Sequence, residues 1–169
     1  MNNRNFTNAA ELDDAFNALG HSTSRDHYHE LLRELRPLVA DRLDTISKSF
    51  DNAGFPRFAV LWCLIGVCSA DAISLMCRGI ADADKYTRWA ASEGLAKCET
   101  PQSTDALVSA LRDRSNLVKG VAVAAMERLR PLSAVPQLRK IANSWYQQTH
   151  SPGTVSAALR AIELIENGE

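Results

Sequence analysis

The sequence contains no long apolar run and no excess of charge of one sign. Its longest apolar stretch, residues 58–68, is far shorter than the about 20 residues that a membrane-spanning helix needs. Residues 1–16 contain no apolar segment of the kind found in a signal peptide. Nineteen basic against 20 acidic residues create no field that would attract a polyanion or an acidic membrane. We therefore expect a soluble cytoplasmic protein that does not bind membranes.

Cysteine is scarce, and its spacing excludes the common zinc motifs. The four cysteines, Cys63, Cys68, Cys77 and Cys98, fall in stretches of helical periodicity and do not form two closely spaced pairs. Because free cysteine behaves as a small buried hydrophobe, we expect free thiols; a disulfide and a metal site are the alternatives. Free thiols agree with a reducing compartment.

The sequence also lacks the local signatures of a reaction centre. It has no glycine-rich phosphate loop, no Gly-x-Ser-x-Gly turn and no cysteine placed beside a histidine. We expect a protein that is not an enzyme and that has no metal and no cofactor.

Helical periodicity runs through the whole chain, and no segment alternates with the period of two that is typical of a strand. An apolar stripe that includes Leu35, Val39 and Leu43 passes through Pro37, where proline predicts a kink or break. The predicted helices span about residues 8–19, 24–36, 37–50, 56–66, 70–81, 85–98, 103–112, 116–130, 133–148 and 153–166.

Pairs of an acidic and a basic residue recur every 31 residues. They are Asp51 with Arg57, Asp82 with Arg88, and Asp113 with Lys119. A helical repeat of this length forms units that bury their apolar faces only by stacking on their neighbours.

The segments around the basic residues align without gaps: Pro56-Arg57-Phe58-Ala59, Thr87-Arg88-Trp89-Ala90 and Val118-Lys119-Gly120-Val121. This pattern resembles the HEAT repeat, in particular the short HEAT-like repeats typified by the phycobilin lyases. The resemblance implies an all-α fold, a right-handed α-solenoid of about four helix pairs. It also implies a structural ladder from repeat to repeat, formed by the three acidic and three basic residues.

The ends of the chain depart from the repeat. In the fourth copy the interval stretches to 37 residues, with His150 and Ser156 at the ladder positions, so the ladder is expected to stop there. Residues 1–36 do not match and are expected to form an N-terminal helical cap, followed by the solenoid over residues 37–169 in the same structural domain.

The second helices of the pairs line the concave surface in HEAT-like solenoids, and this implies a binding groove here. Its expected protein-binding residues are Phe58, Trp62, Trp89, Glu93, Val123 and Glu127, whereas Val121 and Ala125 are expected to face the core. The helix at residues 56–66 is apolar all round, so Phe58 and Trp62 are either covered by the N-terminal helices or exposed as a patch.

A surface of this kind predicts a non-catalytic module that binds another protein or a peptide, as an adaptor, an assembly factor or an inhibitor such as the immunity partner of a toxin. Nucleic-acid binding is one alternative, based on Arg112, Arg114, Lys119, Arg128, Arg130, Arg139 and Lys140. Glu93 and Glu127 in the expected groove argue against it, because a phosphate backbone is bound through Lys and Arg. A HEAT-like lyase or another enzyme is the second alternative.

Overall fold

The computed structural model describes residue 14, residues 25–52 and residues 54–168, and its regular elements along these residues are helices without a strand. They are α2 (Arg25–Asp41), α3 (Leu43–Ser49), α4 (Arg57–Cys63), α5 (Ala70–Gly79), α6 (Lys85–Leu95), α7 (Pro101–Ala110), α8 (Asn116–Leu129), the 3-10 turn η1 (Leu132–Ala134), α9 (Val135–Ala142), α10 (Trp145–His150) and α11 (Pro152–Asn167). The helix expected at residues 8–19 lies outside the described residues, apart from residue 14.

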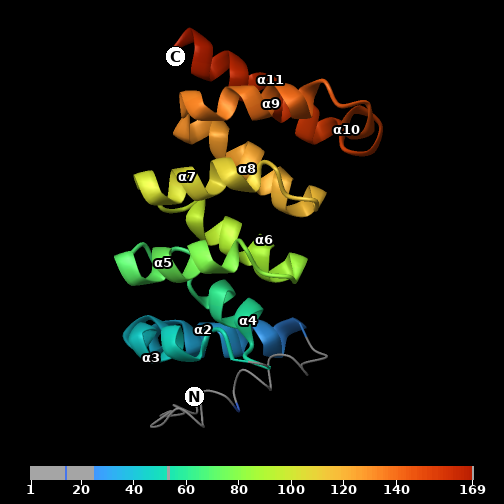
Figure 1. Ribbon diagram of the computed structural model, residues 1–169. Helices are drawn as coiled ribbons and strands as arrows, with labels where there is room; N and C mark the ends of the chain where they lie inside the picture. Colours follow the sequence, from blue (N-terminus) through green and yellow to red (C-terminus); the bar gives the residue numbers. More distant parts are fainter. Residues whose placement is uncertain (1–13, 15–24, 53, 169) are drawn as a thin grey trace.

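The helices stack in chain order, from α2, α3 and α4 at one end to α9, α10 and α11 at the other (Figure 1). Within the layers, α5 packs against α6, α7 against α8, and α9 against α11. Between layers, α4 contacts α6, α6 contacts α8, and α8 contacts α11. Each layer therefore buries its apolar residues against the next, which is the packing that the repeat predicts.

Apolar residues at equivalent positions of the repeat form the core between layers. Leu64, Leu95 and Met126 follow one another at the 31-residue interval, and all three are fully buried. Local signals also set where the helices begin: the side chains of Ser69, Asp84 and Thr100 accept backbone amide hydrogen bonds at the starts of α5, α6 and α7.

Of the kink or break predicted at Pro37, the break is wrong. Helix α2 continues through Pro37 to Asp41, across the boundary expected between residues 36 and 37, and the chain leaves the helical region at Arg42 (φ −123°). Leu35 and Val39, which flank the proline, are both fully buried. Their packing offsets the roughly 3 kcal/mol that a proline inside a helix costs.

The single helix predicted at residues 133–148 is also wrong. The segment forms η1, α9 and α10, because Ser144 leaves the helical conformation and its side chain accepts a hydrogen bond from the amide of Gln147. The cap starts α10, a separate six-residue helix between α9 and α11.

Candidate functional site

Arginines of one layer pair with aspartates of the next. The Arg57 Nε atom lies 2.6 Å from Asp82 Oδ2. One repeat later, Arg88 binds Asp113 through two bonds, Nε to Oδ2 at 2.6 Å and Nη2 to Oδ1 at 3.0 Å. Each pair joins residues that are 25 positions apart, so the two pairs connect three consecutive copies of the repeat.

The second of these pairs is buried and also holds the turn before α6. The Arg88 and Asp113 side chains are 6% and 9% exposed. Arg88 Nη1 donates to the carbonyl oxygens of Asp82 and Ala83, at 2.9 Å each. Burial alone would raise the pKa of the Asp113 carboxyl, but hydrogen bonds from Arg88 and from the Ser115 amide, with the charge of Arg88, hold that pKa below its ordinary value.

The two remaining ladder residues have other neighbours. Asp51 pairs with Arg78 at 2.5 Å, and Arg78 also donates to the carbonyl and hydroxyl oxygens of Ser47. Lys119 has no ion pair within the described part of the chain. The residue 25 positions after Lys119 is Ser144.

In the fourth copy, where the ladder was expected to stop, neither His150 nor Ser156 forms an ion pair within the described residues. His150 ends α10 and stacks on Tyr146, with ring centroids 4.3 Å apart. The Ser156 hydroxyl donates to the carbonyl of Pro152 inside α11. The 31-residue interval counted from Asp113 leads to Ser144, and α10 follows directly after that position.

Three aromatic side chains meet where α4 contacts α6. Trp62 lies 4.9 Å from Trp89 between ring centroids, and Phe58 lies 5.8 Å from Trp62 and 6.5 Å from Trp89. All three are half-buried. We refer to them as the aromatic cluster. Helix α2 packs against α4, but residues 1–13 and 15–24 lie outside the described residues, so both alternatives for Phe58 and Trp62 stay predictions.

A hollow of about 290 Å³ lies between α6 and α8, and we call it the α6–α8 hollow. Its lining consists of small apolar side chains and three charged ones: Glu93, Ala96, Lys97, Val121, Ala124, Ala125 and Arg128. Glu93 is one helical turn beyond Trp89, so the hollow adjoins the aromatic cluster. Glu93 is half-buried and has no hydrogen-bond or ion-pair partner among the described residues.

The structure corrects the predicted contribution of α8. Val123 is fully buried, whereas Val121, which was expected to face the core, is half-buried and lines the hollow. Ala125 is buried in the core as expected, and it also forms part of the lining. Glu127 pairs with Arg160 of α11, Oε1 to Nη2 at 3.1 Å. Because α11 packs against the side of α8 that carries Val123 and Glu127, that side is not open, and the adjacent side faces the hollow.

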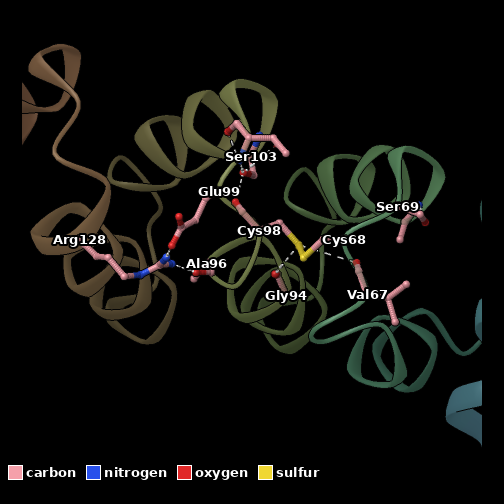
Figure 2. Close-up of a disulfide and its surroundings, with 11 residues drawn as sticks. Val67, Cys68, Ser69, Gly94, Ala96, Cys98, Glu99, Ser103 and Arg128 are labelled. Atoms are coloured by element: carbon pink, nitrogen blue, oxygen red, sulfur yellow. Dashed lines mark hydrogen bonds and ion pairs between the residues drawn. A yellow bond between two sulfur atoms is a disulfide. The ribbon is translucent and has the colours of Figure 1, made fainter.

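A disulfide joins Cys68 to Cys98, so the expectation of four free thiols is wrong (Figure 2). Their Cα atoms lie 5.3 Å apart, although 30 residues separate them. Cys68 follows α4 and Cys98 follows α6, so the bond ties two successive layers together. The separation, close to the repeat length, was the sequence signal for this pairing.

Of the other two cysteines, Cys63 is buried and Cys77 is half-buried, and both are free. Burial raises the pKa of the Cys63 thiol to about 12, against a smaller opposing effect of the Arg36 charge. Disulfides persist mainly in oxidising compartments. The predicted cytoplasmic location therefore loses the support that four free thiols would have given it.

Further contacts continue from the disulfide to the next layer (Figure 2). The Ser103 hydroxyl donates to the carbonyl of Cys98. Glu99, the next residue, pairs with Arg128 of α8, and Arg128 also donates to the carbonyl of Ala96. Since Arg128 and Ala96 both line the α6–α8 hollow, these contacts also define one edge of it.

Several basic residues of the C-terminal half already form ion pairs or hydrogen bonds within the protein. Arg128 pairs with Glu99, and Arg139 pairs with Glu166 at 2.6 Å. Arg114 donates to the carbonyl of Ala83 in the preceding layer.

Within the described ranges no three metal-binding side chains gather in one place, and no helix there is long and apolar enough to cross a membrane.

Residues 54–127 match the family model described as HEAT repeats. The matched segment runs from the turn before α4 into α8 and contains the Arg57–Asp82 and Arg88–Asp113 pairs, the aromatic cluster and the disulfide. A search of the curated proteins finds no significant match to the chain.

Proposed function

We propose that this protein binds another protein or a peptide and catalyses no reaction. In support, residues 54–127 match the HEAT-repeat family model, and stacked helical repeats form extended binding surfaces. The observation that carries the proposal is the continuity of the aromatic cluster with the α6–α8 hollow. A partner segment would lie across α4, α6 and α8.

The chemistry of this surface describes the segment that it would accept. Trp62 and Trp89 are half-buried, so each has ring area left for contact, and tryptophan is enriched among residues that dominate binding energy. The three alanines and Val121 of the hollow leave room for an apolar side chain. Glu93 offers a carboxylate without a partner among the described residues, which favours a lysine or arginine in the bound segment.

Adaptor, assembly-factor and inhibitor or immunity-type roles would all use this same surface. A right-handed solenoid of about four pairs, the phycobilin-lyase type of repeat and a cytoplasmic location remain parts of the proposal. Two of the basic residues on which the nucleic-acid alternative was based, Arg128 and Arg139, already have carboxylate partners, which favours the protein-binding role.

The proposal can be tested by capturing partners from the native cell with the full chain and identifying them by mass spectrometry. Trp89→Ala is expected to weaken binding of the captured partner at least tenfold, because the contact loses an aromatic anchor. Trp145→Ala is the matched control: Trp145 is 74% exposed and lies on α10, away from this surface.

A second variant separates lost contact from lost folding. Ala124 is exposed and lines the hollow, so Ala124→Arg fills the hollow without removing a buried side chain. We expect the same loss of affinity with unchanged helical circular dichroism. Unchanged affinity in both Trp89→Ala and Ala124→Arg would remove the proposal.

A further inference from the structure

The ladder ends at Lys119, which lines the same hollow as Ser144. Lys119 occupies the repeat position of Arg57 and Arg88, and the position 25 residues later, filled by Asp82 and Asp113 in the earlier layers, holds Ser144. Lys119 and Ser144 line one hollow of about 170 Å³, which we call the terminal hollow. The remaining lining residues are Leu111, Arg112, Asp113, Gln137, Lys140, Ile141 and Gln147.

Ser144 does not replace the aspartates of the two earlier layers. Asp82 and Asp113 each accept a backbone amide of their own turn, from Asp84 at 2.8 Å and from Ser115 at 2.7 Å, while also binding an arginine. Ser144 accepts the Gln147 amide at 3.4 Å, but its hydroxyl carries no charge for Lys119. The described residues therefore supply no anion to pair with Lys119.

The charges that line the terminal hollow favour an anion. Arg112, Lys119 and Lys140 have no carboxylate partner among the described residues. Among the described lining residues the one carboxylate belongs to Asp113, and Arg88 binds both of its oxygens. The lining therefore carries an excess of positive charge.

A buried amide in the same hollow lacks a hydrogen bond. Gln147 is 4% exposed; its Nε2 donates to Asn116 Oδ1 at 2.9 Å, and its Oε1 has no partner. Asn116 Nδ2 in turn lies 2.9 Å from the Ser151 hydroxyl. Turning both amides by 180° keeps this chain of hydrogen bonds, with Ser151 as donor, and frees Gln147 Nε2 as a donor.

We propose that the terminal hollow binds a carboxylate group, which pairs with Lys119 and accepts a hydrogen bond from Gln147. The ligand would take the place that Asp82 and Asp113 occupy in the two preceding ion pairs of the ladder. A carboxylate is favoured over a phosphate because the repeat builds the equivalent positions around an aspartate side chain. The proposal is independent of the partner surface on α4, α6 and α8.

The test is an NMR titration of the full chain with acetate, at constant ionic strength balanced with chloride. Saturable shifts are expected at the amides of Lys119, Ser144 and Gln147. Ser144→Asp supplies the carboxylate within the chain, so it is expected to weaken acetate binding at least tenfold and to raise the thermal midpoint. Lys140→Gln, at an exposed lining residue, is expected to weaken binding two- to fivefold, whereas Lys85→Gln at the start of α6 leaves it unchanged.

A second titration distinguishes the sources of the carboxylate. A short peptide with one internal aspartate and blocked ends that binds tenfold more tightly than acetate identifies a polypeptide side chain, and equal affinity identifies a small free carboxylate; both outcomes support the proposal. Shifts no larger than those with chloride alone, undiminished acetate binding to Ser144→Asp, or tighter binding of inorganic phosphate than of acetate would overturn it.

Discussion

Arg88 and Asp113 are 25 residues apart and form a two-bond ion pair between successive layers, with N–O distances of 2.6 and 3.0 Å. Because Arg88 also binds two carbonyl oxygens of its own turn, one side chain fixes the start of α6 and its position against the next layer. The pair is therefore a structural connection, distinct from the surface that we propose for binding.

Arg88→Met is expected to lower the free energy of unfolding by about 3–5 kcal/mol, because it leaves the buried Asp113 carboxylate without its partner. Arg139→Met is the matched control. Its pair with Glu166 is exposed, so a loss of about 0–1 kcal/mol is expected. Urea denaturation followed by circular dichroism measures both, and equal losses in the two variants would contradict the structural role of Arg88.

Stability is expected to fall on acidification below about pH 4. Burial alone would raise the pKa of the Asp84 carboxyl, but hydrogen bonds from Thr87 outweigh it, and the pKa of Asp84, like that of Asp113, lies below its ordinary value of 3.8. A lowered folded-state pKa stabilises the protein above the unfolded-state value, and this stabilisation is lost as the pH falls through the folded-state value.

Asp113→Asn should therefore flatten the decline of the unfolding free energy between pH 5 and pH 2, as measured by urea denaturation at each pH. Parallel curves for this variant and the wild type would show that Asp113 does not contribute to the decline.

Removing the disulfide by the double change Cys68→Ser and Cys98→Ser is expected to lower the free energy of unfolding by about 3–4 kcal/mol, as estimated from the entropy of closing a loop of this length. Cys77→Ser, at a half-buried free thiol, is the control and should change stability much less. Alkylation of the unfolded chain, followed by mass spectrometry, checks the bond itself. Two modified thiols are expected without reductant and four after reduction; four without reductant would contradict the disulfide.

Replacing either of two helical glycines by alanine is expected to change the stability of the protein, in opposite directions at the two positions. A methyl group at Gly79 would meet the buried side chains of Leu61 and Ala91, so Gly79→Ala should destabilise the protein by about 1–2 kcal/mol. At Gly120 the nearest atom, Thr154 Oγ1, is 4.0 Å away, so Gly120→Ala should stabilise α8 by about 0.5–1 kcal/mol. Thermal denaturation measures both shifts, and shifts of the same sign would contradict the close packing at Gly79.

The sequence allowed the repeated elements to be predicted well but their partners only in part. The 31-residue interval identified Arg57 and Arg88 as equivalent residues, and likewise Asp82 and Asp113. In the structure each of these arginines forms an ion pair with the aspartate of the next layer. The interval did not identify Ser144, because the ion pairs connect residues 25 positions apart, and because α10 interrupts the repeat in the fourth copy. Of the expected groove residues, the structure brings Phe58, Trp62 and Trp89 together with Glu93 next to them.

Whether Val123 and Glu127 are open to a partner could not be predicted from the repeat. The sequence repeat treats α8 like α4 and α6, but α8 is also covered by α11. That helix belongs to the atypical last layer, so its packing direction could not be inferred from the other copies.

By itself, the sequence determined where most helices begin and end and which of their sides are apolar. Caps and apolar periodicity act within one or two helical turns, so they can be recognised without knowing the fold. Only the tertiary structure decided which cysteines pair, which side of α8 stays open and which residues line one hollow with Lys119. These outcomes depend on the distance and rotation between stacked layers, because a small change in either brings different side chains into contact.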